Sequence, residues 1–122
     1  MNSFLKDIED FHKKFELIYD GRPRILPERL ADFRIRFMNE ELAEYMMANE
    51  DINRAQALDA LVDLVYVALG TAYLHGFPFE EAWKRVHSAN MTKIRQPSKR
   101  SSEYDVVKPD NFVPPNHDDL VK

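Results

Sequence analysis

Two short clusters of carboxylates are the residues of this chain best suited to chemistry. Glu41 and Glu44 are three residues apart in NEELAEYMM, and Asp59 and Asp63 are four apart in LDALVDLVYVALG. On a helix, both spacings put the two acids of a pair on one face. Four acids that converge from two facing helices would bind one or more Mg²⁺ ions, since Mg²⁺ prefers oxygen ligands; Mn²⁺ could substitute.

The second pair is the more informative of the two. Asp59 and Asp63 lie in an otherwise apolar segment, where an unpaired ionised carboxylate would be very costly. That segment contains no obvious basic partner, so a hard cation is the expected counter-charge. Glu41 and Glu44, taken alone, fit a solvated helix face equally well.

A second candidate group is SANMTKIR, where Asn90 and Lys93 are three residues apart. Their amide and ammonium groups suit phosphate oxygens, and Arg95 could contribute if the chain turns there. The alternative is a polar helix end with Lys93 at the negative end of the helix dipole. A di-iron site is not expected, because Glu9 and His12 form an E-x-x-H pair and the chain has no second one.

Four helices are predicted to position these groups. The apolar spacing and the turn signals give them the residue ranges 3–19, 28–48, 54–75 and 79–91. The short polar turn at 49–53 makes the second and third helices antiparallel neighbours. Gly76 is expected to end the third helix, and Pro78 to lie at the start of the fourth.

The sequence therefore predicts an all-α four-helix bundle. Residues 1–94 would form the helical domain, and residues 95–122, which are polar and rich in proline, an extended C-terminal tail of the same domain. The tail could dock through four apolar side chains, namely Val106, Val107, Phe112 and Val113.

The third helix is apolar nearly all the way round, which a small monomeric bundle rarely buries. We therefore expect a homo-oligomer, most simply a dimer with this helix near the interface. Most aromatic residues at helical spacing are expected in the core: Phe4, Phe11, Phe15 and Trp83. The scattered basic residues are expected to be solvated: Lys13, Lys14, Arg34, Arg36, Lys99 and Arg100.

Composition limits the remaining classes. The chain has 122 residues, 44% of them hydrophobic and 31% charged, which is typical of one globular domain. A net charge of −4 argues against a nucleic-acid polymer as partner. Residues 57–74 approach membrane-spanning length, but their two aspartates favour a buried bundle helix over a membrane segment. The start of the chain lacks the features of a signal peptide, so a cytoplasmic location is expected.

Three stretches of this sequence resemble the all-α NTP pyrophosphatase superfamily: RFMNEELAEYMM, ALDALVDLVYVALGTAYLHGF and EEAWKRVHSANMTK. Within that group the chain is most similar to MazG-like and phosphoribosyl-ATP pyrophosphohydrolase-like proteins, and DIEDFHKKFEL and VVKPDNFVPP extend the resemblance to both ends. It implies a Mg²⁺-dependent enzyme that cleaves a nucleoside triphosphate between the α- and β-phosphates. The products would be a nucleoside or deoxynucleoside monophosphate and pyrophosphate. For the assembly, the apolar third helix leads us to expect a homodimer or homotetramer.

The resemblance also implies roles for the acids. Glu41 and Glu44 match the E-x-x-E metal ligands of the family. Asp63 matches the last acid of a second motif that is commonly E-x-x-D. Ala60 stands where the first acid of that motif is expected, and Asp59, one residue earlier, is either its replacement or a more distant residue of the site.

The basic end of the site follows the same resemblance. Asn90 and Lys93 match an N-x-x-K element that contacts phosphates in relatives, and Lys93 would steady phosphate charge in the transition state. Glu41 or Glu44 could accept a proton from the attacking water, and the sequence does not choose between them.

Two other classes of function remain open on the sequence alone. Because Ala60 replaces an expected acid, the chain could instead be a non-catalytic bundle that binds nucleotide or protein and has a degraded metal site. A purely structural dimerisation module would instead be stabilised when Asp59 and Asp63 are neutralised, because their charge would be uncompensated.

Overall fold

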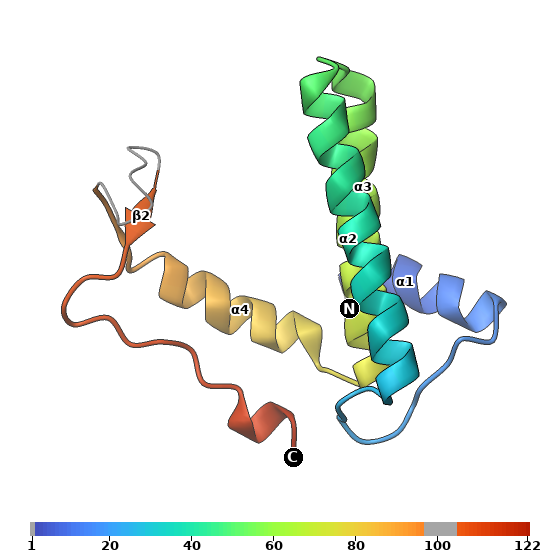
Figure 1. Cartoon of the computed structure of the whole chain (residues 1–122). Coiled ribbons are helices and arrows are strands. Elements are labelled where there is room, and N and C mark those ends of the chain that lie inside the picture. Colours follow the sequence, from blue (N-terminus) through green and yellow to red (C-terminus); the bar gives the residue numbers. More distant parts are fainter. Residues whose placement is uncertain (1, 97–104) are drawn as a thin grey trace.

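The computed structural model describes residues 2–96 and 105–122 and has four helices (Figure 1). They are α1 (Ser3–Lys14), α2 (Glu28–Glu50), α3 (Arg54–His75) and α4 (Phe79–Asn90). Two short strands, β1 (Ile94–Arg95) and β2 (Val106–Val107), and a 3₁₀ helix, η1 (Asp118–Leu120), follow. The predicted all-α helical bundle class is confirmed.

An antiparallel hairpin of α2 and α3 forms the long axis of the molecule (Figure 1). The side chain of Asn53 accepts a hydrogen bond from the backbone N–H of Gln56 at 3.1 Å and so caps the start of α3. Gly76 adopts φ +72°, a left-handed conformation that ends α3 as the sequence predicts. The predicted bounds of this helix are confirmed, and α2 is two residues longer than predicted.

The first helix is shorter than predicted, because α1 ends at Lys14 rather than at residue 19. Glu16 takes a left-handed backbone with φ 58°, and the Leu17 N–H bonds to the His12 carbonyl at 2.9 Å. The His12 ring closes the same turn by donating from Nδ1 to the Leu17 carbonyl at 2.7 Å. This local turn competes with helix continuation, and the apolar spacing of Phe15 and Ile18 did not reveal it.

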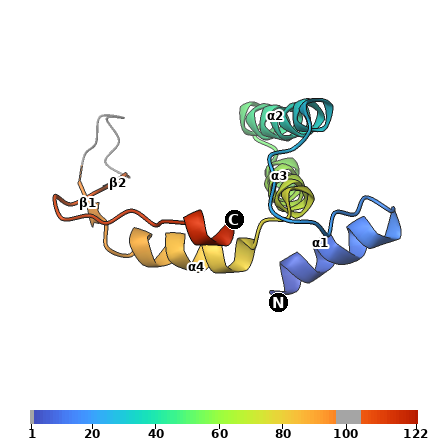
Figure 2. The same cartoon turned by 90° about the horizontal axis from the view of Figure 1, so that it is seen from below.

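Seen along the hairpin, the helices lie in three tiers (Figure 2). α2 forms one tier, α3 the middle one, and α1 and α4 diverge on the far side of α3. Buried apolar side chains gather where α1 and α2 meet the C-terminal half of α3, and they include Ile8, Val67, Leu69, Ala72 and Leu74. The core is therefore small and lies mainly at one end of the hairpin, while Ala48 and Ala60 are buried nearer the turn between the two helices.

Much apolar surface stays exposed in the single chain. Leu58 is 66% exposed and Val62 54%, both on α3. None of the residues of α4, all of which the structure describes, is buried. The prediction of core positions for the aromatic residues is wrong for the single chain, where Phe4, Phe11, Phe15 and Trp83 are exposed.

By length and composition alone, α3 could also cross a membrane, the one such helix among the described residues. Asp59 and Asp63 on this helix, and its packing along α2, favour the bundle interpretation.

One basic residue departs from the predicted solvated state: Arg34 is only 8% exposed. Its Nε donates to Thr71 Oγ1 at 3.0 Å and its Nη2 to the Val67 carbonyl at 2.9 Å. Gly70 permits this approach, because a Cβ there would lie 2.8 Å from both Arg34 Nη2 and His12 Nε2. We call Arg34 and His12, which is 2% exposed, the basic cluster.

The other predicted basic residues follow a simpler pattern. Lys13, Lys14 and Arg36 are exposed as predicted, whereas Lys99 and Arg100 lie outside the described residues. In the tail, β2 pairs with β1 in antiparallel register, Ile94 opposite Val107 and Arg95 opposite Val106. The division into a domain of residues 1–94 and a tail of residues 95–122 stays a prediction.

Candidate metal site

Three of the predicted acids come together on the α2–α3 hairpin. Glu41 and Glu44 extend from one face of α2 and Asp63 from the facing part of α3, and one carboxylate oxygen of each lies within 4.8 Å of the others. The i,i+3 spacing brings the two glutamates to one face, and the short turn between the helices brings Asp63 to them. We call these three residues the acid triad.

The three side chains of the acid triad differ in their exposure to solvent. Glu41 is 9% exposed, Asp63 is half-buried and Glu44 is exposed. Within the part of the chain that the structure describes, Glu41 Oε2 is buried and has no hydrogen-bond partner. A buried carboxylate oxygen without a partner is costly, so this donor set fits a bound cation.

The electrostatics of the site point the same way. Burial raises the pKa of Glu41, and the hydrogen bond and charge of Glu44, with the charges of Asp63 and Glu40, raise it further. Burial likewise raises the pKa of Asp63, followed by the charge and hydrogen bond of Asp59 and the charge of Glu44. All these neighbours are negative, and a divalent cation among them would reverse the effect.

The fourth predicted acid stands apart. Asp59 is exposed and interacts with Asp63, but it is not one of the three acids whose oxygens gather within 4.8 Å. Ala60 is 3% exposed, so the position where the family motif expects an acid does face the protein interior. One residue is 100° of helix rotation, which turns Asp59 outward.

The predicted phosphate-binding residues lie elsewhere in the chain. Asn90 is the last residue of α4 and exposed, Lys93 is half-buried, and Arg95 is in β1. α4 leads away from the α2–α3 hairpin in both views, so a single chain does not bring its far end to the acid triad (Figures 1 and 2).

The comparison with protein-family models gives one match. The model of the phosphoribosyl-ATP pyrophosphohydrolase family matches residues 8–90, more than half of the 122-residue chain. The chain belongs to this family. Comparison with individual curated proteins found no match.

Membership in the phosphoribosyl-ATP pyrophosphohydrolase family confirms the resemblance to the all-α NTP pyrophosphatase superfamily. It supports a nucleotide pyrophosphohydrolase-like activity, and the acid triad is the candidate metal-binding site. The acid triad and Asn90 lie inside the matched range, whereas Lys93 and Arg95 lie beyond it. The roles of the individual residues stay predictions.

Two polar arrangements were missed from the sequence. The burial of Arg34 had a signal, because it follows Leu30 by four residues and so shares the apolar stripe of α2. The contact of Arg85 with Asp119, at 2.7 Å, had none, since the two residues are 34 apart and no periodicity links them.

Proposed function

We propose that this protein is a Mg²⁺-dependent nucleoside triphosphate pyrophosphohydrolase. It cleaves between the α- and β-phosphates and releases a monophosphate and pyrophosphate. The observation that carries the proposal is the buried Glu41 Oε2, which has no hydrogen-bond partner among the residues that the structure describes and lies in a three-acid cluster, in a chain that belongs to a pyrophosphohydrolase family.

Glu41, Glu44 and Asp63 would hold the metal, with Asp59 beside them. A bound Mg²⁺ supplies charge neutralisation for the polyphosphate and an activated water. Glu44 is the exposed member of the acid triad and is the better placed of the two glutamates to take a proton from that water. The buried Glu41 is better suited to fixing the ion.

Asn90, Lys93 and Arg95 would bind the phosphates from a second copy of the chain. In one chain the end of α4 lies away from the acid triad, while exposed apolar side chains run along α3 and α4. A cavity of about 500 Å³ between α1, α3 and α4 is lined mainly by apolar groups, among them Phe4, Val65 and Trp83. A homodimer or homotetramer that buries this surface would complete the site.

Light scattering of wild type and of Val65→Glu tests the assembly. Val65 is 52% exposed on α3, and a charge there would oppose burial against a second chain. We expect an oligomer for wild type, and a monomer without hydrolysis for the variant. A wild-type monomer that hydrolyses nucleotides would contradict the shared site.

The activity is tested with a panel of the common NTPs and dNTPs, with Mg²⁺, with Mn²⁺ and without metal. We expect metal-dependent pyrophosphate release, and ³¹P NMR signals of pyrophosphate and monophosphate. The appearance of diphosphate and orthophosphate would contradict cleavage between the α- and β-phosphates. Stabilisation by nucleotide and Mg²⁺ without any hydrolysis would favour the non-catalytic binding alternative, which the buried Ala60 keeps in view.

The same panel addresses the identity of the base, since one hydrogen bond or methyl group in a pocket can decide it. A cytoplasmic location is part of the proposal, because it is where a nucleoside triphosphate substrate is available.

A further inference from the structure

Residues 105–122 run back alongside α4, a helix with no buried residue (Figures 1 and 2). The β1–β2 ladder begins with Ile94, one residue after Lys93, and pairs it with Val107. The chain between β2 and η1 then passes along the helix toward its start. Lys93 therefore lies at the junction of α4 and this returning segment.

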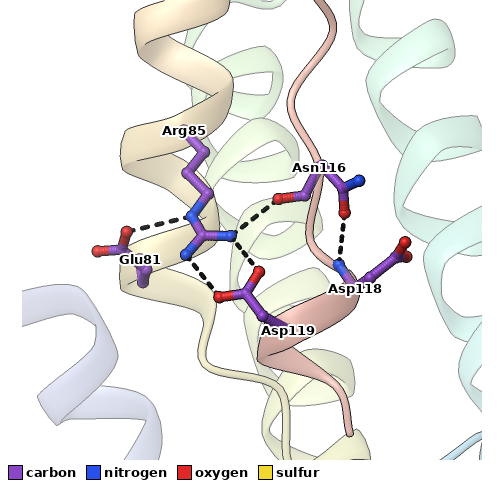
Figure 3. Close-up of polar contacts among 5 residues, drawn as sticks. All are labelled: Glu81, Arg85, Asn116, Asp118 and Asp119. Atoms are coloured by element: carbon purple, nitrogen blue, oxygen red, sulfur yellow. Dashed lines mark hydrogen bonds and ion pairs between the residues drawn. The ribbon is translucent and has the colours of Figure 1, made fainter.

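Arg85 of α4 fastens the far end of the segment (Figure 3). Its Nη1 and Nη2 donate to Asp119 Oδ1 and Oδ2 at 2.7 and 3.0 Å, and Nη1 also donates to the Asn116 carbonyl at 2.8 Å. Nε donates to Glu81 Oε1 at 3.2 Å, which orients the guanidinium from one turn earlier on α4. This two-pronged geometry needs the planar fork of arginine.

The end of the segment is itself ordered by a local contact. Asn116 Oδ1 accepts from the Asp118 backbone N–H at 2.8 Å, so Asn116 holds the start of η1 while its carbonyl binds Arg85 (Figure 3). The Arg85 hydrogen bond lowers the pKa of Asp119 to about 2. The carboxylate therefore keeps its charge throughout the neutral and weakly acidic range, and the contact persists there.

Between the two fastened points lies Phe112. Lys93 Nζ is 5.8 Å and Lys108 Nζ 5.5 Å from the centroid of its ring, within the range of cation–π contacts. A turn closed by Phe112 N–H and the Pro109 carbonyl, at 2.9 Å, sets the direction of the ring. The ladder at residues 106–107 and the Arg85 contact at residues 116–119 hold Phe112 from both sides.

We propose that Arg85 is a positioning residue for Lys93: by fastening residues 116–119 to α4, it keeps the Phe112 ring against the Lys93 ammonium and so orders this side chain for the polyphosphate. The proposal rests on the function proposed above, in which Lys93 binds phosphate. A lysine on a flexible four-carbon stem loses considerable rotamer freedom when it binds, and ordering in advance reduces that loss.

The kinetic test uses the full chain with Mg²⁺ and nucleoside triphosphate. We expect Arg85→Gln and Asp119→Asn each to raise KM roughly three- to tenfold with little change in kcat, the double variant to be no worse than either, and Asp119→Glu to restore most of the loss. Asp10→Asn is the matched control, because it breaks an ion pair with Lys6 at comparable exposure, 59% against 60% for Asp119.

The decisive comparison repeats Arg85→Gln in a Lys93→Ala background. A positioning role predicts no further rise in KM there, whereas a merely structural role predicts the same loss with or without Lys93. An undiminished effect in the Lys93→Ala background would overturn the proposal.

An NMR measurement that does not depend on enzymatic activity tests the positioning of Lys93 separately from the proposed function. In wild type, the ring current of Phe112 should shift the side-chain NMR signals of Lys93 upfield, and Arg85→Gln should remove that shift while Asp10→Asn keeps it. Retention of the shift in Arg85→Gln would overturn the proposal. If wild type releases no pyrophosphate, the proposed function fails, and the NMR comparison alone decides whether Arg85 orders Lys93.

Discussion

The acid triad and the basic cluster each contain one buried charged side chain, Glu41 and Arg34, and the surroundings of these two side chains are opposite. Every polar contact of Arg34 that the structure describes goes to the chain itself, to Thr71 and the Val67 carbonyl, and His12 donates to the Leu17 carbonyl. In the acid triad, Glu41 Oε2 has no partner among the described residues and its neighbours are acids. The protein itself supplies hydrogen-bond partners for the basic cluster, whereas among the described residues it supplies none for Glu41 Oε2.

This difference is what we expect between a charge that stabilises the fold and a charge that binds a ligand. Within residues 2–96 and 105–122 no carboxylate pairs with Arg34, yet carbonyl and hydroxyl acceptors meet the guanidinium where α2 crosses α3. The basic cluster thus joins α2 to α3 through Arg34, and the His12 ring of α1 packs on Tyr73 of α3 with ring centroids 4.7 Å apart. We expect the acid triad to destabilise the metal-free fold, because burial and neighbouring acids raise the pKa values of Glu41 and Asp63, and this is a reason to expect a ligand.

The largest expected effect is on catalysis. Asp63→Asn keeps the shape of the side chain but removes a proposed metal ligand. Mutation of residues that only hydrogen-bond to metal ligands often lowers metal affinity or activity 10- to 100-fold, so we expect pyrophosphate release to fall at least about 100-fold. Steady-state release with saturating Mg²⁺ measures it. Asp32→Asn, at an exposed position of α2, is the control and should retain activity. Near-wild-type turnover in Asp63→Asn would remove this residue from the site.

The matching change in the basic cluster should act on stability. Arg34→Ala removes two buried hydrogen bonds, to Thr71 Oγ1 and to the Val67 carbonyl, although this carbonyl still accepts from the Thr71 hydroxyl. We expect the free energy of unfolding to fall by about 2–3 kcal/mol, measured by urea denaturation. The exposed neighbour Arg36→Ala should stay within about 0.5 kcal/mol of wild type. Mg²⁺ should stabilise Arg34→Ala and wild type equally, because both keep the acid triad. If Mg²⁺ removed the difference in stability between them, the division between the two regions would be wrong.

The two regions should also respond to acid with opposite signs. Burial lowers the pKa of His12 below 6.5, and the nearby Arg34 lowers it further, while the bond to the Leu17 carbonyl opposes this. Below pH 6.5 His12 binds a proton more readily in the unfolded chain than in the folded protein. The contribution of His12 to stability is therefore complete above pH 6.5 and is lost as the pH falls. The raised pKa values of Glu41 and Asp63 do the reverse in the metal-free protein, which gains stability as the folded carboxylates protonate first.

Denaturation of the Glu41→Gln/Asp63→Asn protein between pH 7.5 and 5.5 isolates the effect of His12. We expect stability to fall on acidification with a slope no steeper than about 1.4 kcal/mol per pH unit, the limit for one proton. His12→Asn in that background should flatten the slope, whereas His87→Asn, at an exposed position, should leave it unchanged. An unchanged slope in His12→Asn would assign the pH dependence to other groups.

The smallest expected effect concerns Asp59. This acid is exposed and acts on the acid triad through Asp63, so Asp59→Asn should lower pyrophosphate release by less than about tenfold. A loss as large as that of Asp63→Asn would instead identify Asp59 as the replacement for the acid missing at Ala60.

The sequence predicted the parts of the fold that local chemistry controls. The bounds of α3 follow from its cap at Asn53 and from Gly76, and the carboxylate spacings were enough to anticipate the acid triad. The end of α1 was missed because the His12–Leu17 turn depends on a buried ring, and Arg34 because its acceptors belong to another helix. Contacts such as that of Arg85 with Asp119 depend on how distant segments meet, which spacing along the chain does not encode.

The most direct test of the central claim is the thermal response of Glu41→Gln to Mg²⁺. The account predicts that the metal-free variant melts above metal-free wild type, because it removes an uncompensated buried charge, and that added Mg²⁺ raises the Tm of wild type but not of the variant. Equal responses to Mg²⁺ in the two proteins, or a less stable metal-free variant, would contradict it.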